Sequence, residues 1–135
     1  MDFKKVVVRV YVDVNPTEDQ DKVRVAVEKV LGGIPLEIMQ DEERKHLVGR
    51  SEGPEALSRF YDLLRREQIL DAARKVLFNG IQGNTVCFYL NKQVAYVGHI
   101  SFSQSVGESP LGPIRVEIES DNPHAVIDWL APKTG

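Results

Sequence analysis

Valine occupies every second position from Val6 to Val14, and this run constrains the fold more than any other feature of the chain. Side chains of a strand point alternately to its two faces, so the five valines share one face and Arg9 and Tyr11 share the other. β-branched residues in a period of two predict a half-buried strand over residues 6–14. Pro16 ends this strand, because proline has no N–H to donate to a sheet.

The remaining hydrophobic pattern predicts the order β-α-(ββ)-αα-βββ-α. The first half should contain a helix capped by Thr17 that ends at Gly32-Gly33, two short strands around the turn 41–43, and helices from Gly53-Pro54 to Asn79-Gly80. The second half should contain strands near residues 86–90 and 97–103, a loop at 107–113, and a strand near 114–118. A last helix capped by Asp121 should follow. Helices stacked on one face of a mostly antiparallel sheet bury this pattern economically. We therefore expect a two-layer α+β fold and a single domain over residues 1–135.

The apolar stripe of the long helical region changes phase near Arg66. A straight helix would keep the stripe on one face, so the pattern predicts a break or kink between Arg65 and Gln68. The residues expected to form one core are Val6, Val8, Val10, Val12, Val27, Leu64, Ala73, Val86, Phe88, Ile100, Phe102, Val116 and Trp129.

The charge of the chain argues against generic attraction to polyanions. It has 17 Lys and Arg against 20 Asp and Glu, a formal net charge of −3. Nucleic-acid binders driven by salt release usually carry a basic surplus, so any RNA contact here has to come from a local patch. The single cysteine, Cys87, excludes an internal disulfide and favours a reducing compartment. No apolar run approaches the roughly 20 residues of a membrane span, so we expect a cytoplasmic protein.

No motif of catalysis or metal binding is present. His46, His99 and His124 lie far apart and form no ligand pair, and Cys87 sits inside a predicted strand as a small hydrophobe. The glycine-containing segment 80–84 follows a helix and precedes a strand, the reverse of a nucleotide cradle. We expect no catalytic residue, no metal and no cofactor, and hence no enzyme.

The outward face of the predicted sheet is the first candidate surface. The alternation of side chains along the predicted strands places these residues on the outward face: Arg9, Tyr11, Tyr89, His99, Ser101 and Arg115. Aromatic and arginine side chains on an open sheet stack and clamp single-stranded RNA. Val7, Cys87 and Val97 share the same parity, so a dimer interface or a cover of helices is the alternative, and the residues alone favour it.

Two further polar segments are candidates for RNA contact. Arg74 and Lys75 belong to the densest cationic stretch and could meet phosphate, although a solvated helical face with ordinary charge neighbours is the default explanation. Asn91, Lys92 and Gln93 interrupt an apolar region between two predicted strands. A donor-rich loop there either holds an RNA phosphate or base edge, or satisfies the backbone of its own turn.

Several stretches together resemble uncharacterised protein family 0201, an archaeal family. They are Val14 to Glu18, Leu64 to Arg74, Leu90 to Gln93, Gly98 to Phe102, Leu111 to Ile114 and Trp129 to Pro132. The resemblance covers nearly the whole chain. It implies a fold similar to the large-subunit ribosomal protein five, dimers, and membership of a group of predicted RNA-binding and exosome-associated proteins. It carries over no catalytic residue.

The function expected from this resemblance is a non-enzymatic RNA-associated binding protein. A dimeric structural or assembly protein without nucleic acid is the second hypothesis, and a small-molecule enzyme is the third. The expected partners are RNA and a second copy of the chain. The expected RNA contacts are Arg9, Tyr11, Arg74, Lys75, Asn91, Lys92 and Gln93.

Overall fold

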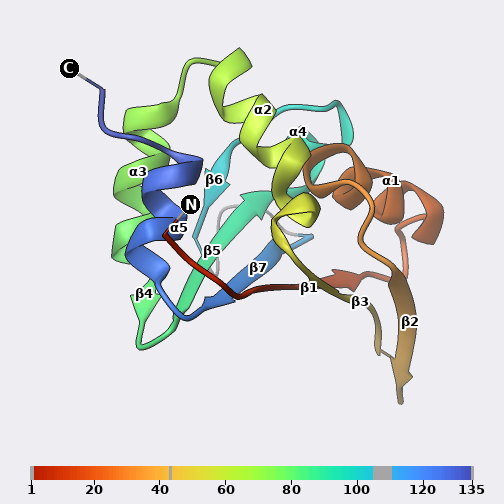
Figure 1. The fold of residues 1–135 in the computed structure, drawn as a ribbon. Coiled ribbons are helices and arrows are strands. Elements are labelled where there is room, and N and C mark those ends of the chain that lie inside the picture. Colours follow the sequence, from red (N-terminus) through yellow and green to blue (C-terminus); the bar gives the residue numbers. More distant parts are fainter. Residues whose placement is uncertain (1, 43, 105–110, 135) are drawn as a thin grey trace.

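The computed structural model describes residues 2–42, 44–104 and 111–134. Figure 1 shows a sheet with the helices gathered on one side of it. The strands are β1 (Val6–Val14), β2 (Leu36–Asp41), β3 (Arg44–Glu52), β4 (Ile81–Gln82), β5 (Thr85–Asn91), β6 (Phe102–Ser103) and β7 (Pro113–Ser120). The helices are α1 (Gln20–Leu31), the 3-10 helix η1 (Pro54–Leu57), α2 (Ser58–Arg66), α3 (Leu70–Asn79), α4 (Lys92–Tyr96) and α5 (Pro123–Leu130). The predicted α+β class with an antiparallel sheet is confirmed.

The N-terminal strand lies in the middle of the sheet. The strand order is β2-β3-β1-β7-β5-β4, with β6 paired to β5, and every pairing is antiparallel. Strand β1 therefore pairs with β3 on one side and with β7, from the other end of the chain, on its other side. The five alternating valines of β1, from Val6 to Val14, belong to the core and are almost fully buried.

The thirteen residues predicted to form the core belong to one cluster. Eleven of them are buried members, and Phe102 and Trp129 pack partly buried against the others. At the centre, the Phe60 ring of α2 stacks on Phe88 of β5 with 5.2 Å between ring centroids. The predicted core is therefore confirmed. It could be predicted because the period of the hydrophobic pattern decides which side chains of a helix or strand point inward.

The predicted break in the long helical region is also confirmed. Helix α2 ends at Arg66 and α3 begins at Leu70, with Gln68 in the left-handed region at a φ of 57°. The Arg65 guanidinium donates to the backbone oxygens of Trp129 and Leu130, at 3.2 and 3.0 Å. The break therefore lies where α2 is tied to the end of α5.

Two predicted helix caps are wrong by one or two residues. Asp19, not Thr17, caps α1, and its carboxylate accepts a hydrogen bond from the Asp21 N–H at 2.8 Å. Asn122, not Asp121, caps α5. Asp121 instead accepts hydrogen bonds from the backbone N–H groups of residues 4 and 5, and so fastens the N-terminal segment.

The segment 92–101 departs most from the prediction. Residues 92–96 form the short helix α4, and Asn91 caps it by accepting from the Val94 N–H at 2.9 Å. Only Phe102 and Ser103 of the expected strand pair with β5. His99 consequently lies beside Glu67 at the end of α2, with 3.5 Å between Nδ1 and Oε2, and not on the outward face. The expected loop 107–113 falls largely on residues 105–110, outside the described residues.

Candidate nucleic-acid interface

The side of the sheet that points away from the helices is called here the open face. It consists of the alternating residues of four adjacent strands: His46, Val48, Arg50, Val7, Arg9, Tyr11, Asp13, Arg115, Glu117, Glu119, Cys87 and Tyr89. Apart from the buried Val7, these side chains are exposed or half-buried.

An arginine flanked by two tyrosines crosses the open face. Arg115 of β7 lies opposite Tyr11 of β1 and, on its other side, opposite Tyr89 of β5. Tyr11 lies opposite Val48 of β3. Opposed side chains on one face of a sheet are close neighbours, with Cβ atoms about 5 Å apart. The strands thus place an aromatic, a cation and a second aromatic in one row.

A hollow of about 330 Å³ opens beside this row. It is lined by Arg9, Val10, Tyr11, Val48, Gly49, Arg50, Arg115 and Glu117. Its wall combines one aromatic ring, aliphatic surface, three guanidinium groups and one carboxylate. Clefts with apolar walls and a few polar groups are the usual form of a small-ligand site.

Each arginine of the hollow already has a glutamate partner. Arg9 contacts Glu119 and Arg50 contacts Glu52, each at 3.0 Å, and Arg115 pairs with Glu117. These pairs are partly exposed, so each contributes little to the stability of the fold. Their main effect is on the surface potential, because a phosphate arriving at the open face has to compete with carboxylates.

Tyr11 is held in place by a histidine from the neighbouring strand. Its hydroxyl is 3.1 Å from Nδ1 of His46, and the two rings lie 4.9 Å apart at an angle of 33°. Burial is the largest cause that raises the pKa of Tyr11, and Asp13 adds to it. The ring is neutral at physiological pH, and with 40% of its surface exposed it is available for stacking.

Burial and neighbouring groups also raise the pKa values of the other two row members. Burial, followed by the Cys87 side chain, raises the pKa of the Tyr89 phenol. A hydrogen bond with Cys87 is the largest cause that raises the pKa of Arg115, and Glu117 contributes further. The row therefore presents two neutral rings around a permanent cation.

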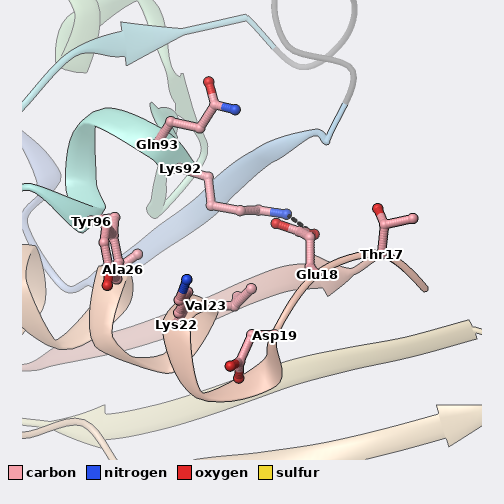
Figure 2. A pocket seen from close by; sticks show the side chains of 9 residues that line it. All are labelled: Thr17, Glu18, Asp19, Lys22, Val23, Ala26, Lys92, Gln93 and Tyr96. Atoms are coloured by element: carbon pink, nitrogen blue, oxygen red, sulfur yellow. Dashed lines mark hydrogen bonds and ion pairs between the residues drawn. The ribbon is translucent and has the colours of Figure 1, made fainter.

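Lys92 is the first residue of α4, and its side chain reaches toward Glu18 in the segment before α1 (Figure 2). Its ammonium donates to the Glu18 carboxylate at 2.9 Å and to the backbone oxygens of Asp13 and Leu111, each at 2.8 Å. The residue is only 3% exposed. All three ammonium protons have acceptors inside the protein, so an RNA contact by Lys92 would require the loss of one of these bonds.

Glu18 is the other half of this buried pair. Burial alone would raise the pKa of its carboxyl, but hydrogen bonds from the Asn15 backbone N–H, the Lys92 ammonium and the Asn15 amide lower it overall. No local pattern predicts a pair between residues 74 positions apart. A cavity of about 330 Å³ lies beside the pair, with the exposed Gln93 at its rim.

Arg74 and Lys75 lie in the helical layer. The Arg74 guanidinium contacts Asp128 at 2.8 Å and the backbone oxygen of Ala131 at 3.1 Å, and it lies over the ring of Phe78. It thereby joins α3 to α5, while Lys75 is exposed next to it. The seven predicted RNA contacts therefore fall in three places: the open face, the pair α3–α5, and the end of the sheet around Asn91.

Three members of the open face were missed by sequence reasoning. All three belong to β3: His46, Val48 and Arg50. Apolar and polar side chains alternate only weakly along this strand, because its inward positions include a glycine. Only the register with β1 places them beside Tyr11 and Arg9. Among the described residues, no three His, Cys, Asp or Glu side chains are grouped closely enough to hold a metal ion. None of the helices in this part of the chain combines the length and the apolar composition of a membrane span.

Comparison with known proteins gives consistent matches. A family model described as RNA binding matches residues 7–120. A UPF0201 protein of Sulfurisphaera tokodaii is 47% identical over 123 residues, which cover 91% of this chain and 85% of that protein. A UPF0201 protein of Metallosphaera sedula is 44% identical, with 90% and 85% covered.

A solved structure agrees with these two sequence matches. The crystal structure of a UPF0201 protein from Methanococcus jannaschii superposes with a TM-score of 0.84 at 34% identity, covering 96% of this chain and 95% of that one. The same architecture thus occurs in an experimentally determined relative. From the extent of these matches, the chain belongs to the archaeal UPF0201 family.

Proposed function

We propose that this chain is a non-enzymatic RNA-associated binding protein that presents its open face to single-stranded RNA. The observation that carries the proposal is the row Tyr11–Arg115–Tyr89 across β1, β7 and β5. Unstacked bases bind on aromatic rings and on guanidinium planes, and an open sheet offers several such platforms at the spacing of its strands. A cytoplasmic location belongs to the same proposal.

The family comparison supports an association with RNA. The match described as RNA binding runs from residue 7 to residue 120, and this range begins in β1 and ends with β7. It therefore contains all strands of the open face. No catalytic step is part of the proposal.

The charges indicate how such an RNA would be held. The arginines of the hollow are paired with glutamates, and the whole chain carries a net charge of −3. Phosphate attraction is therefore weak, and the bases supply most of the binding free energy by stacking. Loss of one stacked ring typically costs about 1–3 kcal/mol.

The experiment is a fluorescence anisotropy titration of labelled single-stranded RNA with wild-type protein and Tyr11→Ala. Tyr96→Ala is the matched control, because Tyr96 is 38% exposed against 40% for Tyr11 but lies on α4. We expect Tyr11→Ala to weaken binding at least about fivefold and Tyr96→Ala to leave it unchanged. Equal effects of the two substitutions, or no binding by the folded wild type at low salt, would reject the proposal.

A second candidate role is a homodimeric assembly protein, and the edge strand β2 favours it. Ile38 and Met39 are 41% and 48% exposed on this six-residue strand, which has no partner on its outer side among the described residues. Two copies paired antiparallel about Ile38 would oppose Ile38 to Ile38 and Glu37 to Met39, with no like charges in contact. Unprotected apolar edges of this kind pair readily with another strand.

The mass of the particle in solution tests the dimer. Light scattering coupled to gel filtration should give twice the chain mass for the wild type and one chain mass for Ile38→Lys. Val97→Lys is the control, because Val97 is 61% exposed but lies outside the sheet. A monomeric wild type at high micromolar concentration would reject this role and leave the RNA proposal intact.

A further inference from the structure

The hollow on the open face holds three polar groups in line across three strands. Arg50 of β3 lies directly opposite Arg9 of β1, and Arg9 lies directly opposite Glu117 of β7. All three line the same hollow. The order across the face is therefore donor, donor, acceptor, because a guanidinium only donates and a carboxylate only accepts hydrogen bonds.

Two arginines opposed on neighbouring strands need a compensating acceptor. Like charges directly opposite each other destabilise a sheet. Here Glu119 and Glu52, which lie opposite Val7 in the neighbouring row of the face, contact the two guanidinium groups at 3.0 Å each. Each guanidinium has five N–H donors, so both retain protons for a ligand that lies between them.

One RNA base carries the complementary order of groups along its edge. In guanine, the acceptors N7 and O6 are followed by the donors N1–H and N2–H₂. Adenine presents an amino donor where guanine has O6, and cytosine has neither N7 nor O6. Uracil offers O4 and N3–H but lacks the N7 acceptor and the amino group.

We infer that the hollow takes a single guanine base, with N7 and O6 toward Arg50 and Arg9, N1–H and N2–H₂ toward the Glu117 carboxylate, and the ring against Tyr11. This inference rests on the proposed function, because it names the base that the same RNA surface selects. Arg115 then has a positioning role. Its pair with Glu117 holds that carboxylate in the hollow, where 27% of the side chain remains exposed.

The test uses five labelled pentanucleotides, UUXUU, with guanine, inosine, adenine, cytosine or uracil as X. We expect the guanine strand to bind about tenfold or more tightly than the adenine strand, since a bidentate contact discriminates against a wrong base by that order. Inosine lacks only the amino group, so its strand should lie between the two. Equal affinity for all five strands would overturn the inference while leaving RNA binding standing, and failure of all five to bind would overturn both.

A pair of substitutions on the open side of the sheet locates the selectivity. Glu117→Gln should reduce the preference for guanine over adenine to a few-fold at most, because an amide offers one acceptor where the carboxylate offers two. Glu37→Gln is the matched control, since Glu37 is an exposed carboxylate on the same face of the sheet, opposite Val48, and does not line the hollow. It should retain the preference. Thermal unfolding of both variants checks that they are folded, and equal loss of the preference in both would contradict the role of Glu117.

Discussion

The Lys92 ammonium lies 2.9 Å from the Glu18 carboxylate, with only 4% of the lysine side chain and 11% of the glutamate side chain exposed. This pair joins the N-terminus of α4 to the segment before α1. A charge left alone in such a place is costly, because little water reaches it. Lys92 therefore contributes to the stability of the fold through this pair.

Removal of the ammonium should destabilise the protein strongly. We expect Lys92→Met to lower the free energy of unfolding by about 3–5 kcal/mol, the usual cost when one partner of a buried pair is lost. Urea denaturation measures the difference. Lys22→Met is the control, because the exposed Lys22 lines the same cavity and should cost less than about 0.5 kcal/mol. A Lys92→Met variant as stable as this control would show that the pair contributes nothing.

The same pair predicts a loss of stability in acid. The pKa of Glu18 is lower in the folded protein than the usual value for a glutamate, so the folded state favours the carboxylate. Its contribution is complete above about pH 5 and is lost as the pH falls through the folded pKa. Between pH 7 and pH 3 the unfolding free energy of the wild type should therefore fall more than that of Glu18→Gln. The other carboxylates titrate in both proteins, so their effects cancel in the comparison. Equal losses of unfolding free energy in the wild type and in Glu18→Gln would therefore contradict the prediction.

The break between α2 and α3 predicts one stabilising substitution. Gln68 has a φ of 57°, a region that costs a non-glycine residue about 1 kcal/mol or more. We expect Gln68→Gly to raise the free energy of unfolding by about 0.5–1 kcal/mol. Lys75→Gly, in the interior of α3, should lower it by about 1 kcal/mol. The prediction is refuted if both glycines destabilise equally.

The paired arginines predict a weak effect of salt on RNA binding. For two or three phosphate contacts on a single strand, the slope of log affinity against log salt should be about −2 or shallower. If the open face is the platform, replacing Arg74 and Lys75 together with alanine should leave this slope unchanged. A slope that flattens by about one unit in this variant would instead place phosphates on the α3 surface.

The sequence predicted the features that depend on local periodicity. Alternation placed the five valines of β1 inward, and the phase change located the helix break at Gln68 within two residues. Helix α4 was missed because five residues are too few to show a helical stripe. That error also put His99 on the wrong side of the protein.

The candidate site depends on contacts between distant segments. Tyr11, Arg115 and Tyr89 were each assigned to the open face by parity, but their alignment in one row follows from the register of three strands. A shift of register by two residues would keep every parity and destroy the row. Similarly, no local pattern predicts that Lys92 meets Glu18. The similarity of the fold to the large-subunit ribosomal protein five stays a prediction.

The central claim, that RNA binds on the open face, is tested most directly by nuclear magnetic resonance. Backbone amide shifts of isotope-labelled protein are recorded while unlabelled single-stranded RNA is added. The account predicts that the shifts concentrate in β1, β7 and β5 around Tyr11, Arg115 and Tyr89, and that α3 around Arg74 stays unchanged. Shifts that cluster on α3 and α5, or no shifts at any RNA concentration, would contradict it.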